Sequence, residues 1–346
     1  MFYLKYRPRT IEELDNSQVR EIIFNMLQSK NLPHAFLYIG PKGMGKTSTA
    51  RIFAKSVNCL NNSYAGKSSS VEPCNRCKNC LGIDASSSAD VMELDAASNR
   101  GIEEVKKLIR ESIFAPMTGR YRVFIIDEAH MITHDAFNAL LKTIEEPPAT
   151  VIFILATTNE EKVPITIQSR CLRVHFGSAT AADISRMLKR ITSKEKITLP
   201  QEIHDLILQY SESSFRDAAK LLEELTIQNK LDLDEAKRYL GIRAKQNLLH
   251  LMKKSEAGES LAWIDEYIKN GGNVKYLLED ILERLRKQLL IKNGISQENT
   301  EDFGFSTKEI TQLLKLFTEA YGSLRISPIP AIPLEIAVIE FYNLKQ

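Results

Sequence analysis

Apolar residues in the first half of the chain fall into short, nearly continuous runs, and the segments between them have the spacing of amphipathic helices. Runs without polar alternation are typical of parallel strands that are buried on both faces of a sheet. Helices are expected over 47–57, 102–112 and 135–145, and two prolines end the last of them. The alternation predicts an α/β fold with a doubly wound parallel sheet. The expected strands are 35–39, 91–94, 123–126, 151–156 and 172–176.

Strand signals stop after residue 176, and the chain continues as a series of amphipathic helices. Short breaks divide the next part into a compact helical bundle that is expected to extend to about residue 241. A further, all-helical domain is expected from residue 244 onward. The breaks lie near 199–200, 211–214 and 231–233, and the later helices are expected over 247–254, 259–269, 274–291, 308–320 and 334–343.

Composition narrows the class of protein. The 346 residues are 43% hydrophobic and 26% charged, which is a globular composition, and the net charge of +2 provides no general attraction to nucleic acid or anionic membranes. The apolar runs are far shorter than the roughly 20 residues of a membrane span, and the N-terminus lacks the pattern of a secretory signal, so a cytoplasmic protein is expected. Two polar segments, 61–72 and 295–306, are interpreted as surface connections.

The strongest chemical signal is the sequence GPKGMGKT at residues 40–47, which matches the phosphate-binding P-loop and lies between an expected strand and an expected helix. Backbone N–H groups of such a loop surround phosphates, Lys46 would reach the β- and γ-phosphate oxygens of ATP, and the Thr47 hydroxyl can bind Mg²⁺. The expected nucleotide-binding residues here are Gly40, Pro41, Lys42, Gly43, Met44, Gly45, Lys46, Thr47 and Ser48.

A second motif follows the strand 123–126, where two carboxylates close an apolar run. Asp127 would hold Mg²⁺, usually through water, and Glu128 would orient the water that attacks the γ-phosphate. Two acids at this place could instead cap a helix. The nearby His130 is interpreted either as a partner of Glu128 or as a polar loop residue.

Three further polar residues stand at places where ligands bind α/β folds or their lids. Thr158 follows the strand 151–156 and could bind γ-phosphate or water, although ordinary turn chemistry also explains it. Arg170 could pair with a surface carboxylate or project toward another nucleotide, because a guanidinium suits bidentate phosphate contacts. Arg216 opens a helix of the bundle and could contact nucleotide or form an ordinary helical ion pair.

Four cysteines lie between the P-loop helix and the second strand with the spacing C-x14-C-x2-C-x2-C. Four thiolates form a closed tetrahedral set, so the pattern predicts a structural Zn²⁺ site at Cys59, Cys74, Cys77 and Cys80. An iron–sulfur cluster and unliganded thiols are the alternatives. The fifth cysteine, Cys171, is expected to be a small buried residue.

In combination, these motifs resemble the AAA+ ATPases and, within them, the gamma/tau family of clamp-loader subunits of bacterial DNA polymerase III. The resemblance covers essentially the whole chain. It depends on YRP at 6–8, the P-loop with the cysteine insertion behind it, ELDAAS at 93–98, IDEAHM at 126–131, FNALLKTIEEPP at 137–148, LATT at 155–158 and SRC at 169–171.

The resemblance implies roles for individual residues. Thr158 is similar to the family's sensor 1 residue, and Arg216 to the sensor 2 arginine, which contacts phosphate from the lid. Arg170 is similar to the arginine finger, which completes the ATP site of a neighbouring subunit. Arg7 and Pro8 would form part of the wall around the base and ribose. The implied domains are an ATPase core with the cysteine module over 1–178, a helical lid over 179–242 and an oligomerising collar over 243–346.

The resemblance also implies an activity and partners. The family hydrolyses ATP with Mg²⁺ to open a ring-shaped sliding clamp and load it onto primed DNA. The implied partners are further gamma/tau copies, the delta and delta-prime subunits, the clamp and primer-template DNA, with Arg100 as a candidate for backbone contacts. No polymerase carboxylate constellation is found beyond the ATP site. The chain stops near the end of the collar, as expected of a gamma-like short form or a shortened tau.

Three features depart from the family's pattern: Ser17 and Ser213 stand where glycine is usual, and the loop between Cys59 and Cys74 is longer. Two other functions stay open. Another AAA+ DNA motor, such as a branch-migration or helicase-loading ATPase, would be expected to lack both the cysteine module and the EEPP sequence. A non-hydrolysing scaffold that resembles delta-prime would be expected to have a degraded P-loop.

Overall fold

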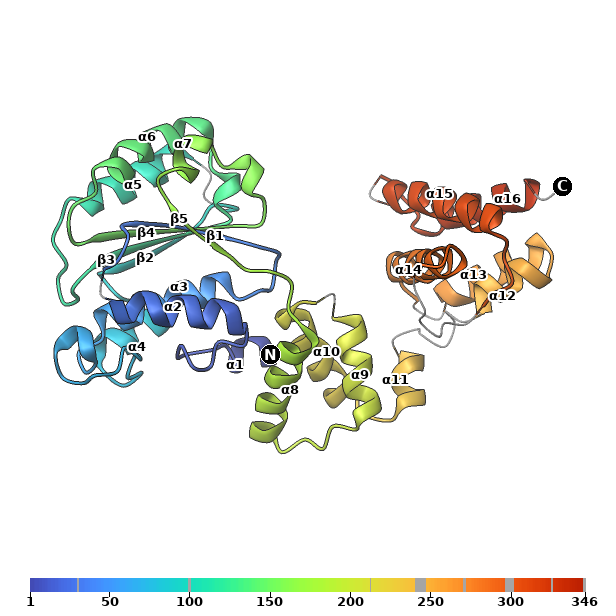
Figure 1. Ribbon diagram of the computed structural model, residues 1–346, viewed down its shortest axis with the longest axis horizontal. Helices are drawn as coiled ribbons and strands as arrows, with labels where there is room; N and C mark the ends of the chain where they lie inside the picture. The colour runs from blue at the N-terminus through green and yellow to red at the C-terminus, as the bar shows by residue number, and fades with distance from the viewer. Residues whose placement is uncertain are drawn as a thin grey trace. The chain divides into compact units, whose positions relative to one another are not determined.

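The computed structural model describes residues 1–29, 31–98, 101–211, 213–239, 247–269, 272–295, 302–324 and 326–344. The chain forms two compact units, Met1–Gln228 and Asn229–Gln346, which are coloured from blue to red in Figure 1. The boundary expected at residue 242 lies outside the described residues. The division into core, lid and collar therefore stays a prediction.

The first unit contains a five-stranded sheet in the order β2-β3-β4-β1-β5, and all neighbouring strands are parallel. The five expected strands are confirmed; β1 has the expected boundaries, and the ends of the other four differ from expectation by at most one residue. Ile39 lies opposite Thr157, and Asp95 lies opposite Asp127, so the carboxyl ends meet at one edge. The strands are β1 (Ala35–Ile39), β2 (Val91–Asp95), β3 (Arg122–Asp127), β4 (Val151–Thr157) and β5 (Leu172–His175).

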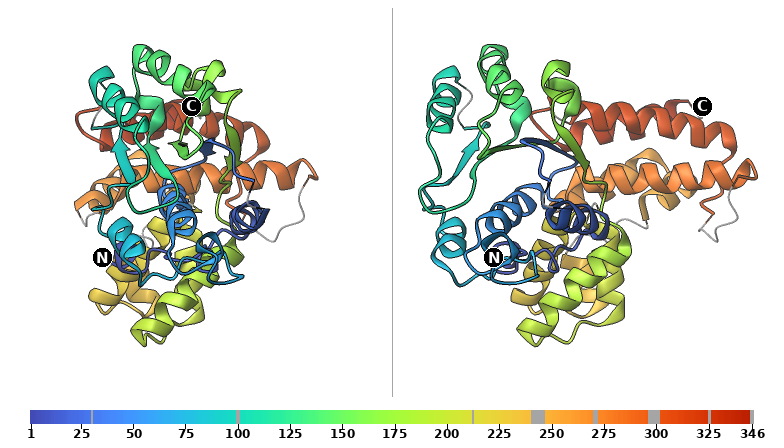
Figure 2. Two further views of the ribbon diagram at one scale, coloured as in Figure 1. Left: turned by 90° about the vertical axis from the view of Figure 1, so that its left-hand side faces the viewer. Right: turned by 60° about the vertical axis from the view of Figure 1, so that its left-hand side comes forward.

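Helices cover both faces of the sheet, as a doubly wound fold requires (Figures 1 and 2). One face carries α2 (Ser17–Ser29) and α3 (Lys46–Asn58), and the other carries α5 (Ile102–Ser112), α6 (His134–Glu145) and α7 (Ile165–Gln168). Aromatic side chains fill both layers: Phe36 contacts Phe53 of α3, and Phe124 stacks on Phe153. Burial on both faces explains why these strands lack polar alternation.

The hydropathy pattern does not reveal four helices of the first unit: α1 (Phe2–Lys5), α2, α4 (Lys78–Asp84) and α7. α1 and α4 are too short to show a helical period. α2 does bury Val19, Ile23 and Leu27 at helical spacing, which is a signal that a search of residues 17–29 could have found.

The interpretation of 61–72 and 295–306 as surface connections is only partly right. In the first segment Tyr64 is buried and its hydroxyl donates to the carbonyl of Leu27. In the second, Phe303 and Phe305 are buried in the core of the second unit. Isolated aromatic residues anchor otherwise polar loops in this way because they bury a large apolar area.

Three helices complete the first unit: α8 (Ala181–Glu195), α9 (Gln201–Tyr210) and α10 (Phe215–Ile227). Thr180 and Ser214 cap the first and the last of them by accepting hydrogen bonds from backbone N–H groups. Their apolar faces form a small core that includes Leu188, Ile207 and Leu222. The expected breaks near 199–200 and 211–214 separate these helices.

The second unit is helical in its described residues, and α14 contacts α15, which contacts α16. A capping box between Ser306 and Glu309 begins α15. No helix among the described residues is long and apolar enough to cross a membrane. The helices are α11 (Leu233–Tyr239), α12 (Asn247–Lys254), α13 (Ala257–Lys269), α14 (Val274–Lys292), α15 (Thr307–Ser323) and α16 (Ala331–Asn343).

Candidate functional site

The P-loop joins β1 to α3 at the carboxyl edge of the sheet. Gly43 and Gly45 have φ angles of +84° and +87°, in the left-handed region that favours glycine. A Cβ on Gly43 would also collide with the Ser214 hydroxyl at the start of α10, and a Cβ on Gly40 would collide with the carbonyl of Phe176. The glycines therefore allow the loop to fit between β5 and α10.

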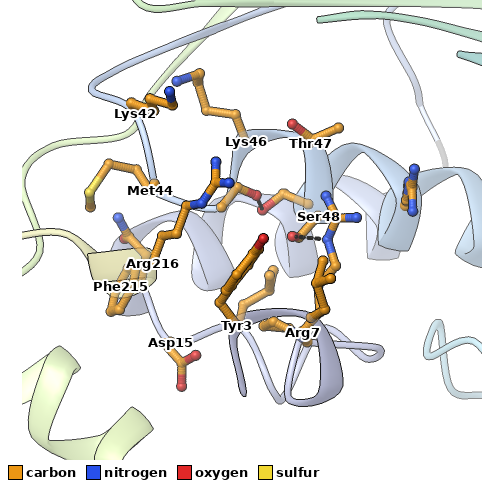
Figure 3. Close-up of a pocket in the computed structure, with 18 of the residues that line it drawn as sticks. Tyr3, Arg7, Asp15, Lys42, Met44, Lys46, Thr47, Ser48, Phe215 and Arg216 are labelled. Atoms are coloured by element: carbon orange, nitrogen blue, oxygen red, sulfur yellow. Dashed lines mark hydrogen bonds between the residues drawn. The ribbon is translucent and has the colours of Figure 1, made fainter. Parts of the chain in front are cut away.

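A cavity of about 700 Å³ lies over this loop (Figure 3). Its lining comes from α1, α3, α8, α10 and the carboxyl ends of β2 and β3, so sheet and helical bundle both contribute. The sequence-predicted residues that line it are Arg7, Pro8, Lys42, Gly43, Met44, Gly45, Lys46, Thr47, Ser48, Asp127, Glu128 and Arg216. Gly40, Pro41, Thr158 and Arg170 are not among its lining residues.

The Lys46 ammonium lies against the P-loop backbone. Its Nζ donates to the carbonyl oxygens of Gly40 at 2.7 Å and Pro41 at 2.8 Å. Burial lowers the pKa of Lys46, while the carboxylates of Glu128 and Asp127 act in the opposite direction. A positive charge with two carboxylates nearby suits a site for phosphates together with a divalent cation.

Thr47 and Asp127 come together across the edge of the sheet, where the Thr47 hydroxyl donates to Asp127 Oδ2 at 2.6 Å. A hydroxyl and a carboxylate oxygen are the ligand types that Mg²⁺ binds beside phosphate oxygens. These two residues, as expected from the two motifs, fit a magnesium site at the cavity.

Glu128 stands next to Asp127 with its backbone in the left-handed region, at a φ of +48°. The Thr158 hydroxyl donates to Glu128 Oε2 at 3.2 Å, and His130 Nδ1 lies 3.5 Å from the same oxygen. His130 therefore lies beside Glu128 rather than apart from it, and it also contacts the Thr157 hydroxyl. Thr158 reaches the site through Glu128 instead of through the cavity lining.

On the opposite side of the cavity, Arg216 and Arg7 lie with Tyr3 between them (Figure 3). The Arg216 guanidinium carbon is 4.7 Å from the centre of the Tyr3 ring, and Arg7 Nε donates to the Ser48 hydroxyl at 2.7 Å. Burial, followed by the nearby Arg51 guanidinium, lowers the pKa of Arg7. Tyr3 has no signal in the sequence, because the four-residue α1 that carries it shows no period.

Arg170 lies away from this cavity. Its guanidinium is 2.6 Å from Glu145 Oε1 and donates to the carbonyl of Thr166 at 2.8 Å. The side chain is 39% exposed, so it is available to another molecule. Of the two expectations for Arg170, the structure displays the pairing with a surface carboxylate. Arg100, the candidate for DNA contacts, lies outside the described residues.

The four expected cysteine ligands converge, and their sulfur atoms all lie within 4.8 Å of one another. Backbone N–H groups donate to the sulfurs, from Cys77 to Cys74 and from Cys80 to Cys77. Such bonds, against the effect of burial, lower the pKa of Cys74 to about 6. A convergent set of four sulfurs that accept N–H bonds fits a tetrahedral metal. Cys171 is separate from the cluster, and burial raises its pKa to about 12.

The cysteine module is also fixed to the wall of the cavity. Lys55 of α3 is 1% exposed and donates to Asn75 Oδ1 in the module and to the carbonyl of Arg9. The Glu72 carboxylate accepts hydrogen bonds from the backbone N–H groups of Ile11 and Glu12. The module thus anchors the N-terminal segment that carries Arg7.

Two of the three departures from the resemblance have a structural account. Ser213 has a φ of +53°, which is the left-handed region that a glycine would adopt more readily. Ser17 begins α2, and its hydroxyl donates to Asp183 on α8 at 3.1 Å. Both serines lie where the bundle of α8–α10 meets the rest of the unit.

Comparison with known proteins gives the following similarities. A family model described as "DNA polymerase III, delta subunit" matches residues 15–180. The DNA polymerase III subunit tau of Bacillus subtilis is 34% identical over 98% of this chain and 62% of its own length. The subunit tau/gamma of Haemophilus influenzae is 40% identical over 55% of this chain and 27% of its own length.

Among solved structures, a DNA polymerase III gamma subunit-related protein from Thermotoga maritima matches with a TM-score of 0.44 and 17% identity, covering 95% of this chain and 100% of that one. The chain spans less than two thirds of the length of the two curated relatives.

Proposed function

Because the chain belongs to the tau/gamma family of DNA polymerase III subunits, we propose that it is an AAA+ ATPase and the motor subunit of a clamp loader. The observation that carries the proposal is the group of side chains suited to ATP hydrolysis at one cavity. Lys46, the Thr47–Asp127 pair and Glu128 with its Thr158 partner stand within a single chain. A subunit that only bound other proteins would have no need for this set.

The proposed mechanism assigns each side chain a task at one ATP molecule. Backbone N–H groups of the P-loop and the Lys46 ammonium bind the β- and γ-phosphates. Thr47 and Asp127 would hold Mg²⁺, which when bound neutralises charge on those phosphates. Glu128 orients the attacking water and polarises its O–H bond, and the Thr158 hydroxyl fixes the Glu128 carboxylate.

Two arginines would stabilise the negative charge on the γ-phosphate during hydrolysis. Arg216 approaches the γ-phosphate from α10 in the same chain, whereas Arg170, which does not line this cavity, serves the site of a neighbouring subunit. Arg7 and Pro8 border the cavity beside Ser48, at the place proposed for the base and ribose. Hydrolysis would therefore depend on assembly.

The wider assignments follow from the family. We infer an ATPase core over 1–178, a lid over 179–242 and an oligomerising collar over 243–346. The proposed partners are further copies of the chain, delta and delta-prime subunits, a sliding clamp and primer-template DNA. Hydrolysis of ATP after clamp and DNA are bound would release both.

A non-hydrolysing role is the second candidate, because the matching family model carries the description of a delta subunit. Against it stands the intact set of Lys46, Thr47, Asp127 and Glu128. Another AAA+ DNA motor is disfavoured by the cysteine module and the EEPP sequence at 145–148.

The test is ATP hydrolysis by the chain mixed with its delta and delta-prime partners, with and without clamp and primed DNA. We expect strong stimulation that needs both clamp and DNA, and no stimulation with the Lys46→Ala chain, which lacks the phosphate-binding ammonium. Turnover that responds to DNA but is indifferent to the clamp would favour a different DNA motor. No turnover under any condition would favour the non-hydrolysing role.

The cysteine module is proposed to bind one structural Zn²⁺. Elemental analysis is expected to find about one zinc per chain, and Cys77→Ser is expected to lose it and to lower the melting temperature, because metal binding contributes directly to folding. Cys171→Ser is the matched control, since this thiol lies outside the cluster and should leave the zinc content unchanged. Iron in place of zinc would support the cluster alternative.

A further inference from the structure

The N-terminal helix α1 is fixed to the helices that would form the lid. The Phe2 N–H donates to Glu223 Oε2 on α10 at 3.0 Å, and the N-terminal amine lies 3.3 Å from the other oxygen of that carboxylate. Lys5 Nζ and the Tyr6 hydroxyl both donate to Glu195 on α8 at 2.6 Å. These contacts fix α1 to both α8 and α10.

This anchoring brings the Tyr3 ring against the Arg216 guanidinium, at 4.7 Å from ring centre to guanidinium carbon. Both residues line the cavity above the P-loop, and Figure 3 shows the ring under the arginine side chain. A Cβ on Gly43 would come within 3.2 Å of the Arg216 Cβ, so the arginine begins directly beside the phosphate-binding loop. Glu223 follows Arg216 by about two helical turns, so α10 carries both the arginine and the anchor of the ring.

An aromatic face is a particular kind of partner for a phosphate-binding arginine. A carboxylate would neutralise the guanidinium and compete with phosphate for its N–H donors. The ring restrains the side chain through its quadrupole and leaves the charge and the N–H groups at the edge of the guanidinium available. Among the described residues, no carboxylate lies at ion-pair distance from Arg216.

We propose that Tyr3 is a positioning residue, which holds the Arg216 guanidinium over the cavity in the orientation that contacts the γ-phosphate. The proposal rests on the proposed ATPase function and adds to it how the arginine of α10 is held ready before nucleotide binds. Tyr3 acts through Arg216 and is not itself a catalytic residue. The selectivity of the site for ATP over ADP would then depend on a residue of α1.

The test is a double-mutant cycle of nucleotide affinity with the full chain. Dissociation constants for ATPγS and for ADP, both with Mg²⁺, are measured for the unchanged chain, Tyr3→Leu, Arg216→Ala and the double variant. Tyr3→Leu is expected to weaken ATPγS binding about fivefold, and ADP binding by less than about twofold. In the Arg216→Ala background, Tyr3→Leu should have almost no further effect on ATPγS.

Tyr3→Phe is the conservative control and should retain the affinity for ATPγS, because the ring face is kept. Equal weakening of ATPγS and ADP by Tyr3→Leu would overturn the proposal, since a loosened α1 or a lost contact with the base affects both nucleotides alike. Equal effects of Tyr3→Leu with and without Arg216 would overturn it as well.

The same double-mutant cycle also tests the proposed function, through the effect of Arg216→Ala on the ratio of the ATPγS and ADP affinities. If Arg216→Ala does not change the ratio of the ATPγS and ADP affinities, the role assigned to this arginine is wrong and the inference on Tyr3 falls with it. If Arg216→Ala reduces the ratio and Tyr3→Leu does not, only the inference on Tyr3 is wrong.

Discussion

Replacing Glu128 by Gln is expected to slow ATP hydrolysis in the assembled complex by about a hundredfold or more, with ATP affinity nearly unchanged. The amide keeps the size of the side chain and can still accept the hydrogen bond that the Thr158 hydroxyl donates. It loses the negative charge that is proposed to polarise the attacking water. Turnover and equilibrium ATP binding, measured on the same preparation, separate the two effects.

The matched control for this variant is Glu161→Gln. Glu161 is an exposed carboxylate three positions after Thr158 and does not line the cavity, so its loss should leave turnover unchanged. Normal turnover of the Glu128→Gln chain would contradict the assignment, and His130, at 3.5 Å from Glu128, would become the next residue to replace.

Arg170→Ala is expected to lower hydrolysis in the assembled complex by about a thousandfold, because a trans-acting arginine stabilises charge in the transition state. Nucleotide affinity of the chain alone should be unaffected, since Arg170 does not line the cavity of its own chain. Binding of ATP by the separate chain and turnover by the complex are therefore the two measurements.

Two controls test whether the loss arises from the arginine itself. Arg173→Ala removes an equally exposed arginine nearby, which pairs with Glu160, and should be nearly silent. Glu145→Gln removes the carboxylate that Arg170 contacts at 2.6 Å but keeps the arginine. If Glu145→Gln reproduced the full defect, the ion pair would be structural and the trans-acting role would be wrong.

Much of the fold could be predicted from local patterns. β1, α5 and α12 have the expected boundaries, the ends of the other strands differ by at most one residue, and the other later helices differ by up to three residues at an end. Buried strands show a continuous apolar run because both of their faces are buried. Amphipathic helices show a periodic apolar pattern because only one of their faces is buried. The four-residue α1 was missed because a helix of one turn has no period to detect.

The same distinction applies to the candidate site. The P-loop and the cysteine cluster could be identified from spacing, since their ligand groups lie close together in the chain. Thr158 and Glu128 could each be named, but their 3.2 Å contact depends on how β3 and β4 pair in the sheet. The sequence does not decide between the two interpretations of His130 for the same reason. No local pattern indicates Tyr3, because only the docking of α1 on α10 brings it to Arg216.

By itself the sequence determined the alternation of strands and helices, the P-loop motif, the acidic pair after β3 and the set of four cysteines. Each strand, helix or motif is encoded in one local segment of the chain, Cys59 to Cys80 for the cysteine set, because backbone geometry and burial restrict which residue types fit there. The tertiary structure decided which distant side chains meet: Lys55 with the cysteine module, Thr158 with Glu128 and Tyr3 with Arg216. Such contacts follow from strand register and helix packing, which depend on the summed burial of many residues and leave no local pattern.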